Sequence, residues 1–539
     1  MADSDTDKIT YFAETDSRHD HKKFGIKDSD RSKHIYVIGK TGMGKSTLLE
    51  NMAIQDIQSG NGIVYIDPHG GTAEKLLEYV PEERIKDVLY FAPFDMEYPV
   101  SFNVMEDVGV NKRHLVVNGL MSVFEKIWED AWSARMAYIL QNTLLALLEY
   151  PGATLLAVNR MYTDKEFRNK VVANVTDVSV KSFWLDEYTK YTDKYTQEAT
   201  PAIQNKIGQF AGNPLIRNII GQPKSSFNLR EIMDEKKLMI VNLSKGRVGE
   251  GNARLLGSML ITKIYLAAMS RADEKTVALS KLPQFYLYVD EFQSFADKSF
   301  ADILSEARKY KLSLTMAHQY IEQMDDEARE AVFGNVGTMI TFRVGAYDAD
   351  VLEKEFAPVF IAEDLVNLGL RQIYLKLMID SVSSQPFSAV TIPPIVPPEK
   401  SYVGKIIENS RKTFAKSRSE VEKKIIDWHE EGRTVSLPKP TGPRSTPYKP
   451  EPKAIDIRGY KEKFQQPQPV AVPSQNISLK NLNERNNNQR KPDAKNVADL
   501  RDALKAVTGQ IISHPVTEKK PETKTGPSPE ELKKILDVS

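Results

Sequence analysis

The stretch that decides the fold is Gly39-Lys40-Thr41-Gly42-Met43-Gly44-Lys45-Ser46, which fits the pattern G-x-x-x-x-G-K-[ST] of a phosphate-binding loop. Residues 34–38 before it are rich in β-branched side chains and predict a strand. Residues 46–57 after it have the apolar spacing of a helix. In such a loop the backbone N–H groups face phosphate oxygens, and the helix N-terminus adds its positive dipole end. The stretch therefore predicts a nucleotide-binding α/β core.

The residues expected to bind ATP lie in this loop and just after it. We expect Lys45 to bridge the β- and γ-phosphates and the Ser46 hydroxyl to bind Mg²⁺. The full set expected at the nucleotide is Gly39, Lys40, Thr41, Gly42, Met43, Gly44, Lys45, Ser46, Thr47 and Asp67. The alternative is a glycine-rich strand-to-helix turn that binds no nucleotide.

An acidic pair follows a second predicted strand. Residues 285–289 are a continuous apolar run, as expected for a strand buried on both faces, and Asp290-Glu291 follows directly. We expect Asp290 to hold the metal and Glu291 to polarise the attacking water as a general base. The second carboxylate is typical of a hydrolysing motor. The alternative is an acidic N-cap of the next helix.

The spacing of these motifs predicts an insertion. Lys45 and Asp290 lie 245 residues apart, far more than a minimal nucleotide-binding domain needs. The predicted core strands are residues 34–38, 62–66, 88–91, 238–242, 285–289, 312–316 and 338–342. Between the third and fourth strands, residues 111–235 have helical spacing throughout. We therefore expect a predominantly parallel central sheet interrupted by an all-helical subdomain.

Two further polar residues follow predicted core strands. Asp67 comes after the strand 62–66, at the sheet edge where ligands gather in open α/β folds. The alternative for Asp67 is a capping turn. Gln319 lies just past the strand 312–316 and is a candidate sensor of the γ-phosphate. The alternative for Gln319 is a loop amide with no role in the chemistry.

Two arginines are candidates for an arginine finger that reaches the γ-phosphate of a neighbouring subunit. Arg343 follows the strand 338–342, and Arg247 lies in the glycine-bearing loop 244–251. The alternative for each is an ion-paired or surface arginine.

The amino-acid composition excludes several classes of protein and of functional site. The chain has no cysteine, which excludes disulfides, Cys-ligated zinc, iron–sulfur clusters and thiol nucleophiles. No apolar run reaches the roughly 18–20 residues that span a bilayer. Residues 255–269 come nearest, but they contain Lys263 and predict a buried amphipathic helix. The formal net charge is zero because residues 401–539 hold 27 Lys and Arg against 18 Asp and Glu, a net of +9, which balances −9 in residues 1–400.

The amino-acid composition changes in the C-terminal part of the chain. Residues 438–473 contain nine prolines, and residues 481–489 are rich in side-chain amides, so we expect residues 435–539 to be mostly disordered. Two short helical patterns, residues 497–507 and 529–536, are candidate docking motifs or marginal helices in a solvated tail. Residues 405–431 predict one polar helix leaving the folded body.

The expected organisation is an N-terminal polar segment (1–33), the first part of the ATPase core (34–110), the inserted helical subdomain (111–235), the second part of the core (236–400), a helix leaving the core (401–434) and a disordered basic tail (435–539).

The motifs together resemble the HerA–FtsK superfamily of DNA-pumping ATPases. The resemblance rests on the phosphate loop, on Asp67-Pro68-His69-Gly70, on the strand that ends in Asp290-Glu291-Phe292 and on His318-Gln319. Within the superfamily, the helical insertion and residues 286–344 are most similar to conjugative coupling proteins of type IV secretion systems, the TraG/TraD kind.

This resemblance covers about residues 10–395 and implies a RecA-like core, a hexameric ring and ATP-driven movement of DNA through a central pore. It also implies Lys45 and Ser46 at the nucleotide, Asp290 and Glu291 at the metal and water, and Gln319 as sensor.

The sequence departs from the coupling proteins at its start. Those proteins usually carry N-terminal membrane helices, whereas here only 33 polar residues precede the first predicted strand, and the barrel of HerA-type helicases is also missing. We therefore expect a cytoplasmic ATP hydrolase, recruited to the inner face of the membrane by a partner such as a relaxase or a channel protein through the tail. The leading hypothesis is a DNA translocase. The alternatives are an ATPase for pilus assembly or protein export, a HerA-like DNA-processing motor and a nucleotide-gated adaptor.

The DNA hypothesis needs basic groups along the DNA path. Lys181, Lys190 and Lys194 are candidates because they alternate with Tyr188, Tyr191 and Tyr195. The alternative is a solvated helix with alternating charges.

Overall fold

The computed structural model describes residues 8–16, 21–106, 108–191, 193–274, 276–296 and 299–431. Within these ranges the side chains of residues 193–199, 276–277 and 299 are not described. The predicted tail of residues 435–539, with its two helical patterns, lies outside the described residues.

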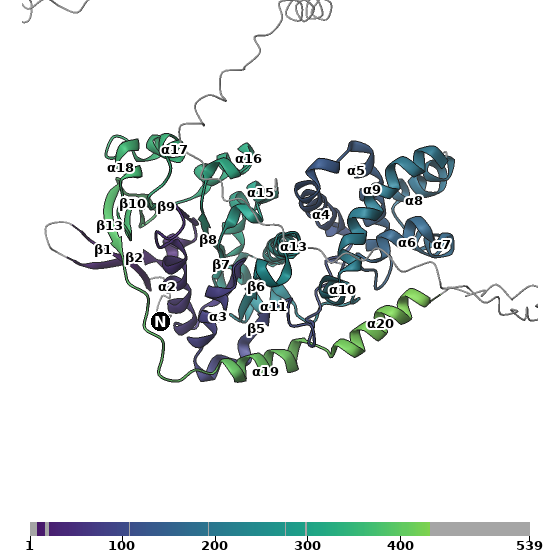
Figure 1. Ribbon diagram of the computed structural model, residues 1–539, viewed down its shortest axis with the longest axis horizontal. Coiled ribbons are helices and arrows are strands. Elements are labelled where there is room, and N and C mark those ends of the chain that lie inside the picture. The colour runs from purple at the N-terminus through teal and green to yellow at the C-terminus, as the bar shows by residue number, and fades with distance from the viewer. Residues whose placement is uncertain are drawn as a thin grey trace, which may run out of the picture. The chain divides into compact units, whose positions relative to one another are not determined.

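One large sheet organises the core (Figure 1). It has 11 strands in the order β2-β1-β13-β10-β9-β3-β8-β7-β4-β6-β5. The strands are β1 (Ile9–Glu14), β2 (Lys23–Lys27), β3 (Ile35–Ile38), β4 (Gly62–Asp67), β5 (Val88–Phe91), β6 (Leu238–Asn242), β7 (Phe285–Val289), β8 (Leu312–His318), β9 (Thr338–Thr341), β10 (Gln372–Lys376) and β13 (Phe387–Thr391), with β11 (Met378–Ile379) and β12 (Val382–Ser383) as a separate hairpin.

The strands predicted from the sequence form the parallel part of this sheet. From β9 through β3, β8, β7, β4 and β6 to β5, every neighbouring pair is parallel. The predicted mixed α/β fold with a predominantly parallel sheet is confirmed. Because the strands are parallel, their carboxyl ends share one edge, where the ligand site of an open α/β sheet lies.

The N-terminal residues are folded, which corrects the expectation that the first strand begins at residue 34. β1 and β2 form an antiparallel hairpin, and β1 also pairs with β13. β13 pairs with β10, and β10 pairs with β9. The four strands β2, β1, β13 and β10 therefore form an antiparallel extension of the parallel sheet. The sequence does not reveal these strands because few of their residues are buried: three of six in β1 and one of five in β2.

Helices cover both faces of the sheet. The core helices are α1 (Asp28–Arg31), α2 (Lys45–Gln58), α3 (Gly71–Glu78), α12 (Lys245–Val248), α13 (Glu250–Met269), α14 (Thr276–Lys281), α15 (Ser299–Glu306), α16 (Asp326–Asn335), α17 (Ala346–Phe356) and α18 (Ala362–Val366). Strand β3 shows the two-sided burial: Ile35 and Val37 pack with α2 and α3, whereas Tyr36 and Ile38 pack in the core that contains α13.

The described residues between β5 and β6 contain helices and no strand. They are α4 (Arg113–Ile127), α5 (Ala134–Leu148), α6 (Ala157–Thr163), α7 (Lys165–Asn174), α8 (Val178–Ser182), α9 (Asp193–Gly212), α10 (Pro214–Ile220) and α11 (Leu229–Asp234). We call residues 110–235 the helical insert. Its helix α4 packs on α13 of the core at Gly119, where an added Cβ would lie 2.3 Å from Thr262 Cγ2. Glycine is therefore required for this close approach of the two helices.

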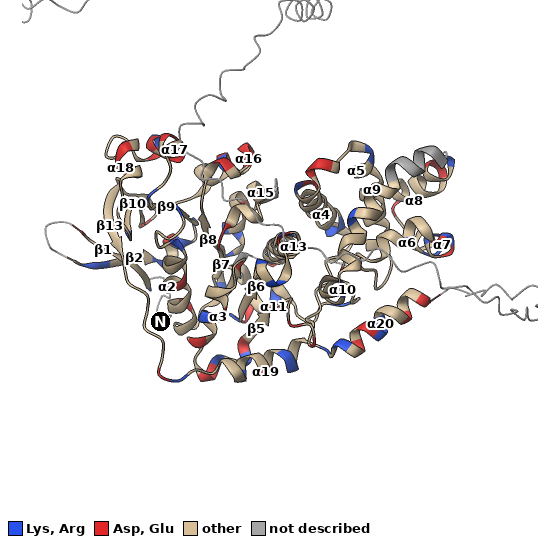
Figure 2. Cartoon of the chain, viewed as in Figure 1, with Lys and Arg blue, Asp and Glu red and all other residues tan. Residues whose placement is uncertain are grey.

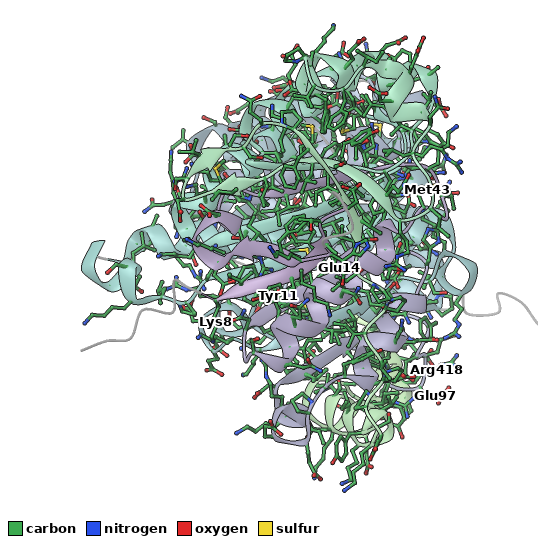
Figure 3. The ribbon with its side chains drawn as sticks, turned by 90° about the vertical axis from the view of Figure 1, so that its left-hand side faces the viewer. Lys8, Tyr11, Glu14, Met43, Glu97 and Arg418 are labelled. Atoms are coloured by element: carbon green, nitrogen blue, oxygen red, sulfur yellow. The ribbon has the colours of Figure 1, made fainter. Side chains whose placement is uncertain are left out.

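Two helices, not one, follow the sheet, and they lie against the folded body. α19 (Val403–Phe414) runs beside β5, where the Tyr90 N–H donates to Ser410 Oγ over 2.9 Å. α20 (Arg418–Glu430) then packs on α10, with Asn218 Nδ2 donating to Glu422 Oε1 over 3.2 Å. The Arg418 N–H also donates to the Glu97 carbonyl oxygen over 2.9 Å, and Figure 3 labels both residues. Acidic and basic residues are interspersed along both helices (Figure 2).

A buried arginine ties the N-terminal hairpin to the core. Arg31 is 1 % exposed, and its guanidinium donates to both carboxylate oxygens of Asp56 over 2.8 and 2.7 Å. It also donates to the Tyr288 hydroxyl over 2.7 Å and to Thr10 Oγ1 over 2.9 Å. A buried ion pair of this geometry holds its partners firmly because each charge needs the other once water is excluded.

We predict that Arg31→Ala lowers the free energy of unfolding by about 3–5 kcal/mol, because it leaves the Asp56 carboxylate buried without its counter-charge. Chemical denaturation measures the change. Lys424→Ala is the matched control, since Lys424 pairs with Glu420 over 2.7 Å at the surface and such pairs contribute at most about 1 kcal/mol. Equal effects of the two substitutions would contradict the proposed importance of the buried pair.

Candidate nucleotide-binding site

The phosphate loop joins β3 to α2 at the carboxyl edge of the parallel strands. Gly42 and Gly44 have φ angles of +79° and +119°. Residues with a side chain rarely adopt such angles, so both positions favour glycine. The loop is fixed to the neighbouring strands: the Gly39 N–H donates to the His318 carbonyl oxygen over 3.2 Å, and the Lys40 N–H donates to that of Arg343 over 2.8 Å. The sheet therefore sets the position of the loop.

Lys45 is the first residue of α2, and its ammonium folds back over the loop. Its Nζ donates to the carbonyl oxygens of Gly39 over 2.6 Å and Lys40 over 3.2 Å. Burial lowers the pKa of Lys45, while the charges of Glu291 and Asp290 oppose that shift. The ammonium therefore lies in the concavity of the loop, where phosphate oxygens bind in loops of this type.

Ser46 and Asp290 meet across the site. The Ser46 hydroxyl donates to Asp290 Oδ2 over 2.8 Å, although 244 residues separate them. Burial raises the pKa of Asp290, and the charges of Asp67 and Glu291 add to the rise, while the Ser46 hydrogen bond opposes it. A hydroxyl and a carboxylate are hard oxygen donors that suit Mg²⁺.

The described residues contain no group of three or more acidic or His side chains that could hold a metal by itself. This agrees with the usual mode of Mg²⁺ binding, in which one or two protein ligands are completed by phosphate oxygens and water.

Glu291 lies beside this pair with unusual backbone geometry. Its φ and ψ are 48° and 49°, in the left-handed region. The Gln293 amide donates to Glu291 Oε2 over 2.5 Å, and His69 Nε2 lies 3.9 Å from Oε1, at ion-pair distance. Burial alone raises the pKa of Glu291, but the His69 and Gln293 donors and the charge of Lys45 outweigh it and lower the pKa to about 2.

Gln319 contacts the phosphate loop directly. It follows β8, and its amide nitrogen donates to Thr41 Oγ1. The preceding His318 is fully buried, and its Nδ1 lies 2.8 Å from the Tyr36 hydroxyl. The end of β8 therefore places the Gln319 amide in contact with the phosphate loop. The sequence alone could not distinguish a candidate sensor from a loop amide with no role in the chemistry.

The Asp67 carboxylate is engaged by its own loop. Oδ1 accepts from the His69 N–H over 2.8 Å, and Oδ2 accepts from the Ala73 N–H over 2.9 Å. These bonds cap the turn after β4, which favours the capping alternative for Asp67. They also fix the loop that carries His69.

The two candidate finger arginines lie on different parts of the core. Arg343 follows β9, and its carbonyl oxygen accepts from Lys40 of the same chain's phosphate loop. Arg247 lies in α12, after β6, with its guanidinium 53 % exposed and 3.1 Å from Glu74. Its guanidinium also stacks over the Phe94 ring at 4.6 Å. Three strands (β8, β7 and β4) separate β6 from β3 and its phosphate loop.

Sequence reasoning missed Arg371, which precedes β10. Its N–H donates to the Met43 carbonyl oxygen over 3.3 Å, and its side chain lies near Gly44. The Arg371 guanidinium donates to the Thr391 carbonyl oxygen over 3.1 and 2.5 Å. No motif marks this residue, because the antiparallel pairing of β10 with β9 is what brings it to the loop.

The basic residues considered for a DNA path lie in the helical insert. Lys181 Nζ donates to the Val175 carbonyl oxygen over 3.3 Å. The Tyr191 hydroxyl donates to Glu187 Oε1 over 2.5 Å, and the Tyr188 ring packs on Trp184 at 4.7 Å. The described tyrosines thus pack against the insert, while the side chains of Lys194 and Tyr195 are among those not described.

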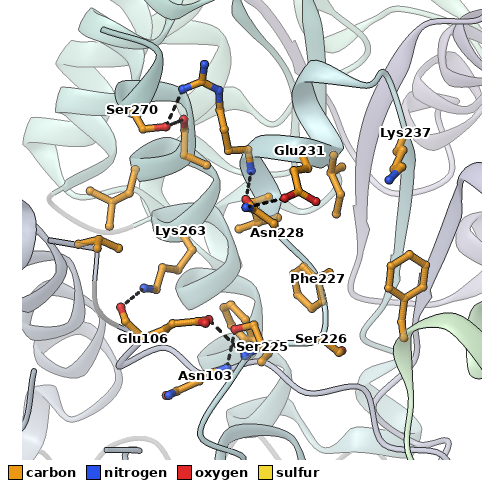
Figure 4. Close-up of a pocket in the computed structure, with 18 of the residues that line it drawn as sticks. Asn103, Glu106, Ser225, Ser226, Phe227, Asn228, Glu231, Lys237, Lys263 and Ser270 are labelled. Carbon is orange, nitrogen blue, oxygen red and sulfur yellow. Dashed lines mark hydrogen bonds between the residues drawn. The ribbon is translucent and has the colours of Figure 1, made fainter. Parts of the chain in front are cut away.

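A cavity of about 580 Å³ lies elsewhere, where the helical insert joins the core (Figure 4). The Ser225 N–H donates to Glu106 Oε2 over 3.2 Å, and Lys263 Nζ donates to the Glu106 carbonyl oxygen over 3.4 Å. These bonds join the chain entering the insert, the chain leaving it and α13. The cavity is therefore part of the joint, and none of the phosphate-site residues lines it.

A model of the protein family described as type IV secretory system conjugative DNA transfer matches residues 7–350. No curated protein sequence matches the chain. Among the described residues, no helix has both the length and the apolar composition needed to cross a bilayer.

Solved structures with the same fold include the plasmid coupling protein TrwB. In complex with a non-hydrolysable ATP analogue, TrwB matches with a TM-score of 0.51 and 14% identity, over 74% of this chain and 97% of that chain. In complex with ADP and Mg²⁺, it matches with a TM-score of 0.51 and 15% identity, over 70% and 89%. At this identity the likeness establishes the fold, a RecA-like α/β core.

We predict that Lys45→Ala weakens binding of Mg²⁺-ATP about tenfold or more, because it removes a charged donor from the phosphate loop. Calorimetric titration measures the loss. Lys86→Ala is the control, because Lys86 is an exposed lysine in the turn before β5 and lies outside the phosphate loop. A loss of equal size in Lys86→Ala would contradict the role given to the Lys45 ammonium.

Proposed function

The chain belongs to the type IV secretory system conjugative DNA transfer family, and from this membership we propose that it is an ATP-driven translocase that moves DNA. The observation that carries the proposal is the 2.8 Å contact of Ser46 with Asp290, with Glu291 next in the chain. It brings a phosphate loop, a candidate metal ligand and a candidate general base into one site, which a motor that hydrolyses ATP requires.

In the proposed reaction, the residues of the phosphate loop act first on binding. Lys45 exchanges its bonds to the loop carbonyl oxygens for bonds to the β- and γ-phosphates. Ser46 and Asp290 would hold Mg²⁺, and the ion would neutralise charge on the phosphates. Both residues already lie within hydrogen-bond reach of each other, so little rearrangement of the backbone is needed.

Glu291 then orients the attacking water and accepts its proton, in the role of general base. Gln319 is placed to report the change at the γ-phosphate, since its amide already bonds Thr41 of the loop. Loss of the γ-phosphate would change the hydrogen bond between Gln319 and Thr41. Strand β8, which precedes Gln319, would transmit this change to the core.

We further propose that the chain works as a homo-hexameric ring with the finger supplied between subunits. Arg247 is the better candidate for this finger, because it is exposed and lies three strands away from its own phosphate loop. Arg343 lies against its own loop and suits a role within one subunit. Because the proposed reaction consumes ATP, we propose that it takes place in the cytoplasm, and the basic tail is our proposed contact for a relaxase or a channel protein at the membrane.

We predict that DNA stimulates ATP hydrolysis by the wild-type chain and that Glu291→Gln lowers turnover by about 10²–10⁴-fold, because the amide cannot accept the water's proton. Steady-state ATPase assays with and without DNA measure both effects. Calorimetry on the variant checks that it still binds ATP. Turnover that ignores DNA but responds to a secreted protein would replace the DNA proposal with a protein-export ATPase.

We also predict that Arg247→Ala and Lys45→Ala are each inactive alone and recover activity when co-expressed. In a mixed ring, the Lys45→Ala subunit supplies Arg247 to the intact phosphate loop of its neighbour. Arg343→Ala mixed with Lys45→Ala is the control and stays inactive, because Arg343 lies at its own loop. Recovery in the control mixture alone would assign the finger to Arg343.

A further inference from the structure

The Glu291 carboxylate is held by neighbouring side chains on both of its oxygens. Gln293 donates to Oε2 over 2.5 Å, and His69 Nε2 lies 3.9 Å from Oε1. A general base needs a lone pair directed at the proton it removes. In the described state, both oxygens face protein groups instead.

We propose that His69 and Gln293 are positioning residues that restrain Glu291 in the resting enzyme and release it when hydrolysis is triggered. The proposal rests on the ATP hydrolysis part of the proposed function and adds a regulation of the same site. It does not depend on which ligand is moved.

Gln293 and His318 each carry a buried side-chain atom that has no hydrogen-bond partner among the described residues. These atoms are Gln293 Oε1 and His318 Nε2. The His318 ring packs edge-on against Phe292, the residue between Glu291 and Gln293, at 6.2 Å. In the tautomer of neutral His318 whose Nδ1 accepts from the Tyr36 hydroxyl, Nε2 carries the hydrogen and is a donor, whereas Gln293 Oε1 is an acceptor.

This pair of unmet groups defines an alternative arrangement. If Gln293 turns from Glu291 to His318, a buried donor and a buried acceptor satisfy each other, and Glu291 loses one restraint. Buried polar groups without partners are rare and costly, so pairing them would offset part of the cost of losing the Gln293–Glu291 hydrogen bond. Two such arrangements are what a switch between resting and active states requires.

The loop that carries His69 is held by the first residue of α12, the helix that contains Arg247. The Lys245 N–H donates to the Pro68 carbonyl oxygen over 2.9 Å, next to His69. Lys245 Nζ donates to Ser294 Oγ over 3.1 Å, next to Gln293. Lys245 thus contacts the segments that carry both restraining residues. Arg247 lies two residues further on. If Arg247 contacts the nucleotide of a neighbouring subunit in a ring, the resulting movement of α12 would shift the loop that positions His69.

The test compares basal and stimulated hydrolysis in His69→Ala and Gln293→Met. We expect basal ATPase activity without DNA to rise about tenfold in each, as release of a resting state would give, while KM for ATP stays unchanged because neither side chain contacts the phosphate loop. DNA-stimulated turnover stays near the wild-type value, so the ratio of stimulated to basal activity falls. His69→Gln, which keeps an N–H donor, is expected to stay close to wild type.

His114→Ala is the matched control, since His114 is exposed on α4 of the helical insert and leaves both rates unchanged. Basal and stimulated rates that fall together, or that do not change, would overturn the proposal, because a purely structural role would not raise basal activity. A wild-type enzyme that DNA does not stimulate would defeat the proposed translocase alone. The basal rise still decides the restraint in that case.

Discussion

The bidentate contact between Arg31 and Asp56 couples three parts of the chain that the nucleotide site needs together. Asp56 lies on α2, the helix that begins at the phosphate loop, and Tyr288 lies two residues before Asp290. Arg31 follows the N-terminal hairpin. One buried guanidinium therefore ties the N-terminal hairpin to α2, which begins at the phosphate loop, and to β7, which ends at the acidic pair.

The parallel strands and the phosphate loop could be predicted because buried strands are apolar on both faces. Residues 285–289, for example, carry no polar side chain except tyrosine hydroxyls, and the motif residues follow such runs directly. The hairpin of β1 and β2 could not, since fewer of its residues are buried than in the parallel strands. The bend at residues 415–417 between α19 and α20 was also missed, because both helices are polar and their separate packing depends on contacts that are distant in the sequence, such as those with β5 and α10.

The candidate site divides along the same physical line. Lys45, Ser46, Asp290 and Glu291 lie at strand and helix ends whose positions follow from topology, so their meeting was predictable. The partners of Glu291 were not, because His69 and Gln293 reach it through a turn fixed by Asp67 and through a left-handed backbone at residue 291. Arg371 comes from an antiparallel strand that no motif marks. Local sequence carries the chemistry of a site more clearly than it carries the restraints around it.

The placement of α19 beside β5 has a consequence for how the protein stays dispersed. A sheet of 11 strands has two outer edges, and unpaired edge strands invite association with other chains. At β5 the Ser410 hydroxyl occupies a backbone donor that another strand would use. At β2 the outermost strand carries Lys23 and Lys27, and its pairing with β1 is broken by a bulge between Tyr11 and Ala13. Helix cover at one end and charge with irregular pairing at the other protect a long sheet from aggregating edge to edge.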